Sequence, residues 1–185
     1  MHTILWKRVD REGRDACRIV QAYNRWVIEG SAAFEHGSNA ASLVYRVVCD
    51  SEWRSIEASI KGWVGSLDID VFIQAAQGEN WSVNGTHVDS LEGLKDIDIG
   101  FTPATNTNAI RRLRLQVGEV VETTAVWLDA DDWTVKPLPQ SYRRIDSSTY
   151  EYSSPLHDFR AKLRTDRFGA VIDYPGLWLA RGPNG

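Results

Sequence analysis

Apolar and polar residues alternate with a period of two along much of this chain, and this pattern constrains its fold most strongly. Between Ile56 and Lys61, apolar residues at even positions alternate with polar residues at odd ones, and residues 66–74 continue in the same style. Successive side chains of a β-strand point to opposite faces of a sheet, so each segment predicts a half-buried strand. The Asn84-Gly85 pair between two short runs is typical of a β-hairpin turn.

Comparable segments follow at short spacing and bring the total to about a dozen predicted strands. Besides those already named, they cover residues 17–23, 25–35, 42–50, 96–101, 119–129, 133–145, 149–153, 159–166 and 170–175. So many short strands predict a mainly β protein, with a many-stranded antiparallel sheet that is strongly curved or closed into a barrel. Pro137 and Pro139 cannot donate to a strand ladder, so their segment is expected at an edge or a bulge. No repeat or linker divides the chain, so residues 1–185 are expected to form a single domain.

The segment from Asn108 to Gly118 is the best helix candidate. Asn108 can cap a helix start, and Gly118 can follow a helix end. Between them lies an apolar stripe at helical spacing, formed by Ala109, Ile110, Leu113 and Val117. Leu115 falls on another side, which indicates a helix buried on two sides, as it would be inside a curled sheet. A strand over residues 111–117 is the alternative.

Two acids share one face of the strand that precedes this helix, and arginines follow within the helix. The acids are Asp96 and Asp98, and the arginines are Arg111, Arg112 and Arg114. An enclosed guanidinium without a partner costs several kcal/mol, so carboxylates are expected nearby, and these two aspartates are the obvious candidates. A solvated outer face for the aspartates is the alternative. The arginines could form structural ion pairs or hold a phosphate or carboxylate head group.

Composition excludes several classes of function. The 25 acidic residues exceed the 21 basic ones, giving a net charge of −4, which argues against a nucleic-acid partner. Cys17 and Cys49 are too few for a disulfide framework. The charged N-terminus shows no signal peptide and no apolar run approaches the ~20 residues of a membrane helix, so we expect a cytoplasmic protein without an integral membrane segment. The four scattered histidines show no metal-ligand spacing, and no nucleotide or nucleophile motif occurs, so neither a metal nor a cofactor is expected.

Several strings occur together in an order that resembles a known bacterial family. They include WSVNG, GFTPATNTNAIRRL, QSYRRI and FRAKLRTDRFGAVIDYPGLW, and the resemblance runs from about Trp6 to Trp178. The family is the one called "putative glycolipid-binding". The resemblance implies a many-stranded antiparallel sheet wrapped around a single α-helix, a tight homodimer, an acidic pocket and a remote likeness to lipoprotein localisation factors.

The resulting hypothesis is the binding of a glycolipid or similar amphipathic ligand in a polar, acidic pocket of a β cavity, with a role in glycolipid metabolism. Two alternatives stay open: an enzyme that acts on a sugar or lipid head group through paired carboxylates, and a non-catalytic structural dimer. The candidate ligand-binding residues are Asp96, Asp98, Arg111, Arg112, Trp53, Glu57, Trp81 and Tyr150.

Each of the last four candidates has a simpler structural alternative. Trp53 and Trp81 could stack on sugar faces or pack in the core. Glu57 could reach the cavity mouth or lie exposed. Tyr150, which shares a strand face with Tyr152, could bind ligand through its hydroxyl or pack. The separate pair Asp68 and Asp70 could join the pocket or, as we favour, face water.

Overall fold

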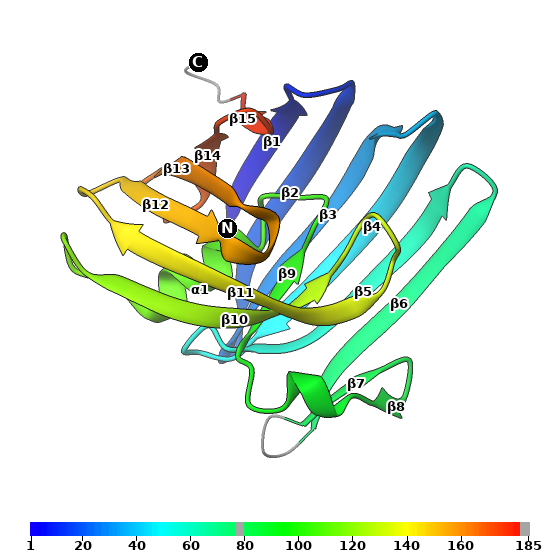
Figure 1. Ribbon diagram of the computed structural model, residues 1–185, viewed down its shortest axis with the longest axis horizontal. Helices are drawn as coiled ribbons and strands as arrows, with labels where there is room; N and C mark the ends of the chain where they lie inside the picture. Colours follow the sequence, from blue (N-terminus) through cyan, green and yellow to red (C-terminus); the bar gives the residue numbers. More distant parts are fainter. Residues whose placement is uncertain (77–79, 182–185) are drawn as a thin grey trace.

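A computed structural model describes residues 1–76 and 80–181, and within them fifteen strands form one curled, open sheet (Figure 1). The first eight strands are β1 (His2–Arg8), β2 (Gly13–Ala22), β3 (Arg25–His36), β4 (Asn39–Cys49), β5 (Ser55–Val64), β6 (Leu67–Ala76), β7 (Asn80–Val83) and β8 (Thr86–His87). The others are β9 (Asp96–Ile99), β10 (Val120–Leu128), β11 (Val135–Arg144), β12 (Thr149–Ser154), β13 (Phe159–Thr165), β14 (Val171–Tyr174) and β15 (Trp178–Ala180). The helical elements are α1 (Asn106–Leu113) and two 3-10 turns, η1 (Asp89–Leu91) and η2 (Pro155–His157).

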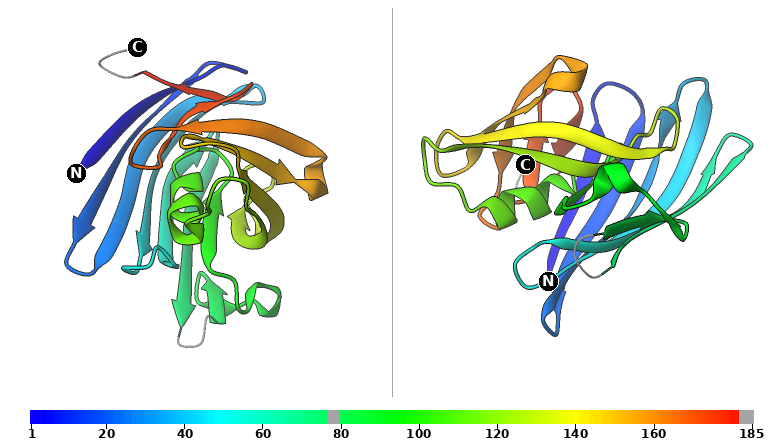
Figure 2. Two further views of the ribbon diagram at one scale, coloured as in Figure 1. Left: turned by 90° about the vertical axis from the view of Figure 1, so that its left-hand side faces the viewer. Right: turned by 60° about the horizontal axis from the view of Figure 1, so that its bottom comes forward.

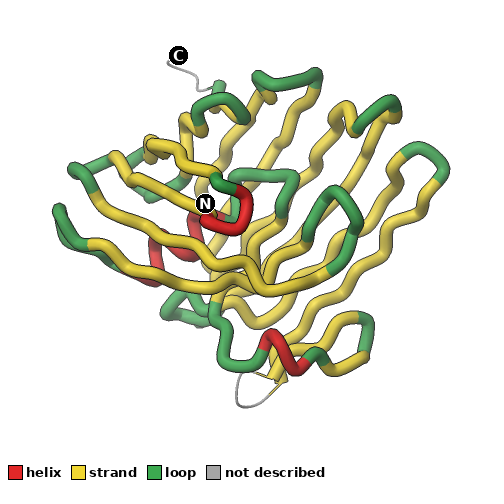
Figure 3. Tube along the Cα trace, viewed as in Figure 1, coloured by secondary structure: helices red, strands yellow, loops and turns green. Residues whose placement is uncertain are grey.

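The first and the last strand of the sequence pair in the middle of the sheet. Strands β1 to β8 follow one another across one half and β15 back to β9 across the other, and β1 pairs with β15 where the halves join. Every described pairing is antiparallel except that of β9 with β10. The sheet curls so that α1 lies in its hollow, as the left view of Figure 2 and the trace in Figure 3 show.

The mainly β, curved-sheet prediction is confirmed, and the structure adds two strands that the pattern did not indicate. These are β1 and β15, whose pairing joins residues from opposite ends of the sequence. The edge prediction for the proline segment also agrees with the pairing. Pro137 and Pro139 lie opposite β10, in the part of β11 that precedes the pairing of Ser141–Arg144 with β12.

The helix prediction is confirmed, but its predicted bounds are wrong at both ends. The helix begins at Asn106 after Thr105, and it ends at Leu113 because Arg114 adopts a left-handed conformation (φ 48°). Asn108 is not the cap: its side-chain amide donates to Ser55 Oγ (3.1 Å) and to the Ile97 carbonyl (3.3 Å). The early end turns Leu115 into the core and leaves Val117 exposed.

Two apolar clusters fill the hollow on either side of β9 and α1. The larger one packs the inner faces of β1–β6 against β9 and the segment that follows it, with Ile97 and Ile99 fully buried. The smaller one packs α1 against β11–β14, through Ala109, Ile110 and a group of tyrosines that includes Tyr142. In the part of the chain that the structure describes, no helix is both long and apolar enough to span a membrane.

Candidate functional site

The pairing of an acid on β9 with an arginine on α1, expected from the sequence, is confirmed for Asp96 and Arg112. Asp96 is only 2% exposed, and its two carboxylate oxygens accept hydrogen bonds from Arg112 Nε (2.7 Å) and Nη2 (2.5 Å). This two-pronged geometry is the strongest form of the arginine–carboxylate contact. The solvated outer face is thereby excluded for Asp96, and the pair fastens α1 to the sheet.

Asp98 shares that face of β9 but has different partners. Its oxygens accept hydrogen bonds from Gln140 Nε2 (2.5 Å) and Thr105 Oγ1 (3.2 Å), and no described arginine pairs with it. Burial raises the pKa of the Asp98 carboxyl to about 6, and the nearby charge of Asp96 adds to this effect. Each carboxylate oxygen can accept a second hydrogen bond, so Asp98 keeps free acceptor capacity.

Asp98 lines a cavity of about 260 Å³ at the N-terminal end of α1, here called the aspartate pocket. Its walls come from β9, the loop before α1, β10–β13, η2, β14 and β15, which are widely separated in the sequence. The lining residues are Asp98, Ile99, Gly100, Thr102, Pro103, Asn106, Trp127, Asp131, Leu138, Tyr152, Ser154, His157, Phe159, Tyr174, Leu177 and Trp178.

The aspartate pocket contains both hydrogen-bond donors and hydrogen-bond acceptors. The hydroxyl of Ser154 is buried and has no hydrogen-bond partner among the described residues, so its donor and its acceptor are both unused. Burial, and secondly the charge of Asp98, raise the pKa values of Tyr152 and Tyr174, which keeps both phenols protonated at neutral pH. A buried polar atom without a partner is rare in native proteins and is satisfied when a ligand or water binds there.

Aromatic side chains form the apolar part of the same wall. Trp127 packs edge-on against His157, with ring centroids 5.1 Å apart, and Phe159 packs against Tyr174 at 5.9 Å. Gly100 makes room for this arrangement, since a Cβ there would lie 2.9 Å from Trp127 Nε1. The aspartate pocket therefore combines flat apolar surfaces with hydrogen-bonding groups, as small-molecule sites commonly do.

Three other candidate residues line a second cavity at the opposite end of α1. Trp53, Arg111 and Tyr150 contribute to this cavity of about 380 Å³, here called the arginine pocket. Its lining residues are Trp53, Ile110, Arg111, Arg114, Arg144, Ser147, Tyr150, Thr165, Asp166, Arg167, Phe168 and Gly169. The candidate residues expected in a single polar cavity thus line two different cavities, at opposite ends of α1.

The remaining candidates lie away from both pockets. Glu57 is on the outer face of β5, where it pairs with Arg46 (3.3 Å), so it does not reach the cavity mouth. Trp81 is fully buried and donates from Nε1 to the Leu94 carbonyl (3.0 Å), which makes it a core residue. The preference for water at Asp68 and Asp70 is confirmed, since both are exposed.

Some pocket residues that were not predicted could have been found from the sequence pattern, and others could not. Tyr150, Tyr152 and Ser154 alternate along β12 on one face, so extending the tyrosine pattern by two positions would have found the Ser154 hydroxyl. Nothing local distinguishes Trp127 or Trp178 from core tryptophans, because the pocket is assembled from strands far apart in the chain.

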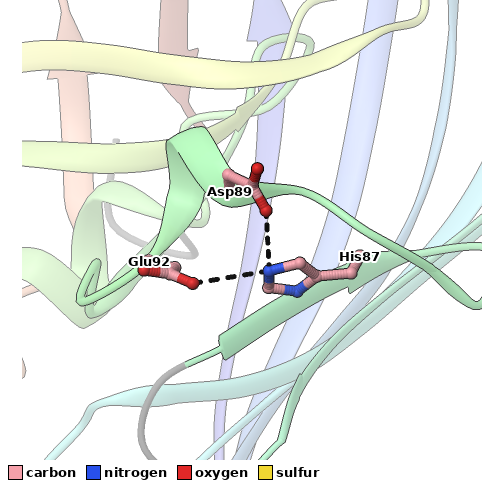
Figure 4. Close-up of side chains that lie close together, drawn as sticks. All are labelled: His87, Asp89 and Glu92. Atoms are coloured by element: carbon pink, nitrogen blue, oxygen red, sulfur yellow. Dashed lines mark ion pairs between the residues drawn. The ribbon is translucent and has the colours of Figure 1, made fainter.

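The structure also brings together three surface residues whose spacing the sequence reading did not single out. His87 Nε2 lies 3.0 Å from Asp89 Oδ1 and 3.4 Å from Glu92 Oε1 (Figure 4). All three residues are exposed: His87 ends β8, Asp89 begins η1 and Glu92 follows η1. Exposed ion pairs of this kind are common without a metal, and the cluster lies outside both pockets.

Comparison with known proteins agrees with the fold and with the resemblance seen in the sequence. A crystal structure of a DUF1089 family protein from Pseudomonas aeruginosa matches with a TM-score of 0.80 and 30% identity, over 90% of this chain and 91% of the other. A β-barrel-like protein of DUF1849 from Brucella abortus matches with a TM-score of 0.57 over 97% of this chain and 93% of the other, but at 8% identity this likeness concerns the fold alone. No protein with a curated description matches the chain. The model of the "Putative glycolipid-binding" family matches residues 3–180, and the chain therefore belongs to that family.

Proposed function

We propose that the protein binds the sugar head group of a glycolipid, or of a similar amphipathic molecule, in the aspartate pocket. The observation that carries this proposal is the unsatisfied hydroxyl of Ser154, a residue that lines the same cavity as Asp98 and an aromatic wall. A carboxylate and a hydroxyl can bond to sugar hydroxyls, while Trp127 and the tyrosines offer flat faces to the C–H side of a sugar ring. The family to which the chain belongs carries a name of the same meaning.

The size of the aspartate pocket indicates which part of such a ligand it would enclose. Its volume of about 260 Å³ lies just below the ~300–1,000 Å³ of typical drug-sized sites. A sugar unit suits this volume, whereas a complete lipid with its acyl chains does not. We therefore infer that the acyl chains stay outside the aspartate pocket and that the sugar supplies the specificity.

The geometry gives no support to catalysis by the two β9 carboxylates as a pair. Both oxygens of Asp96 are engaged by Arg112, and Asp96 does not line the aspartate pocket. An acid–base pair needs two carboxyl groups that can both reach the substrate. Of these two β9 carboxylates only Asp98 lines the pocket, so a binding function is the proposal that the contacts favour.

Titration of an alkyl glycoside by isothermal calorimetry tests this proposal at pH 7.5. We expect saturable binding that weakens about tenfold or more in Asp98→Asn, which removes the charge and one acceptor oxygen, and in Ser154→Ala, which removes the hydroxyl. An alkyl alcohol of equal chain length, which lacks the sugar, should bind much more weakly than the glycoside.

Asp70→Asn is the matched control, since it makes the same chemical change at an exposed position on the outer face of the sheet. Its affinity for the glycoside should equal that of the unchanged protein. If Asp98→Asn and Ser154→Ala bind the glycoside as tightly as the control does, the aspartate pocket is not the binding site. Equal affinity for glycoside and alcohol would reject sugar recognition.

A further inference from the structure

We propose that the arginine pocket is a separate binding site for a phosphate group, either as the free anion or as the monoester of a larger molecule. The arginine pocket shares no lining residue with the aspartate pocket, so this inference does not depend on the function proposed above.

Three separate segments bring arginines to the arginine pocket. Arg111 and Arg114 come from the end of α1, Arg144 from the end of β11, and Arg167 from the turn between β13 and β14. Tyr150 and Phe168 add aromatic surface between them. The cavity of about 380 Å³ is thus lined by arginines from three segments of the chain.

The charges that line the arginine pocket are strongly unbalanced. Four arginines and one aspartate leave three net positive charges. The aspartate, Asp166, is already occupied: its Oδ1 accepts the backbone N–H groups of Phe168, Gly169 and Ala170. Its Oδ2 lies 2.7 Å from His2 Nε2. The end of α1 adds only about half a negative charge through the helix dipole, so a positive excess remains.

Among the arginines of this pocket, Arg111 has the contacts that argue most strongly for an anion site. It is partly buried, and its guanidinium lies 5.2 Å from the ring centre of Trp53 and 5.0 Å from that of Phe168. Nη1 donates to the Phe168 carbonyl (3.1 Å), and no salt bridge joins Arg111 to a carboxylate within residues 1–76 and 80–181. The rings and the carbonyl therefore fix the guanidinium while leaving its charge uncompensated.

Among the described residues, the other arginines of the pocket also form no salt bridge with a buried carboxylate. Arg144 donates to the backbone carbonyls of Leu115 (2.8 Å), Asp146 (3.0 Å) and Ser147 (3.1 Å). Arg114 reaches Glu52 at 3.1 Å, but both side chains are more than half exposed, so this pair is easily exchanged for another. Arg112, one residue from Arg111, has by contrast a buried carboxylate of its own.

Phosphate fits this arrangement better than a carboxylate does. A phosphate monoester presents three oxygens around phosphorus and carries up to two charges at neutral pH. A carboxylate presents two oxygens in one plane. Arginines that arrive from three segments suit the tetrahedral group, and each planar guanidinium can bind a pair of its oxygens.

Calorimetric titration with inorganic phosphate at constant ionic strength, with chloride as the reference anion, tests the site. The test variant is the double change Arg114→Gln/Arg167→Gln, at two exposed positions that can be altered without disturbing the core. We expect saturable phosphate binding in the unchanged protein and at least about a tenfold loss of affinity in this variant. The control Arg18→Gln/Arg46→Gln also removes two positive charges, but from the outer face of the sheet. It should change the affinity for phosphate by less than about twofold, because distant exposed charges are screened.

Two further titrations, with glycerol 3-phosphate and with vesicles that contain phosphatidate, distinguish the sources of the phosphate group. Tighter binding of an ester or of the vesicles assigns a monoester ligand, and tighter binding of inorganic phosphate assigns the free anion; each result supports the site. The proposal is overturned by non-saturable binding, by chloride acting as well as phosphate, or by equal losses in the two double variants.

Discussion

Replacing Arg112 with alanine is expected to lower the free energy of unfolding by about 3–5 kcal/mol. The change leaves the Asp96 carboxylate at 2% exposure without the two hydrogen bonds that compensate its burial. An uncompensated buried charge is far more costly than the loss of a surface ion pair. Urea unfolding, followed by circular dichroism at pH 7.5, measures the effect.

The matched control is Arg18→Ala, which breaks an exposed ion pair with Glu29 on the outer face. This change should cost no more than about 1 kcal/mol. The double variant Asp96→Asn/Arg112→Ala should recover part of the loss, because the unpaired charge is then gone. If Arg112→Ala proves no more harmful than Arg18→Ala, the Asp96–Arg112 pair does not fasten α1 to the sheet.

Replacing Asp15 with asparagine is expected to stabilise the protein by up to about 3 kcal/mol above pH 7 and to leave its stability nearly unchanged near pH 4. Asp15, on β2, is fully buried beneath the loop that precedes α1. Its carboxyl accepts hydrogen bonds from the hydroxyls of Thr102 and Tyr45 (2.9 Å to Oδ2), and no basic side chain pairs with it in the described segments. Burial raises its pKa from 3.8 to about 6.

The sign of this effect follows from proton binding. Between pH 4 and pH 6 the folded protein holds the proton on Asp15 while the unfolded chain has released it, so stability falls as the pH rises through this interval. Asparagine has a similar shape but no proton to lose, so the variant lacks this loss of stability with rising pH.

Urea unfolding of both proteins at several pH values measures the difference, in which the other titrating groups cancel. Asp70→Asn, at an exposed position, should show little difference at any pH. A stability difference between Asp15→Asn and the unchanged protein that stays constant from pH 4 to pH 8 would contradict the burial of an unpaired carboxyl at Asp15.

The sequence predicts the strands well where one face of a strand is buried and the other is not. In β5, Ala58 and Ile60 are buried while Lys61 is exposed, and this contrast is what the alternating pattern records. The pattern is silent about β15, which has three residues and is defined by its pairing with the distant β1. Long-range pairing, and not local preference, creates that strand.

The ends of α1 and the partners of its arginines depend on contacts that local sequence does not encode. Asn108 resembles a cap, yet the hydroxyl of Ser55 draws its side chain into a bond between helix and sheet. Alternation places Asp96 and Asp98 on the same face of β9. They differ because Asp98 accepts a hydrogen bond from Gln140, which lies 42 positions further along the chain. Asp98 and Arg111 likewise line different pockets, at opposite ends of α1.

The most direct test of the central claim is a crystal structure of the protein with a bound alkyl glycoside. We predict a sugar ring in the aspartate pocket, with its hydroxyls within hydrogen-bond distance of Asp98 and Ser154 and its alkyl chain leading outwards. A glycoside bound elsewhere while this pocket holds only water would contradict the account.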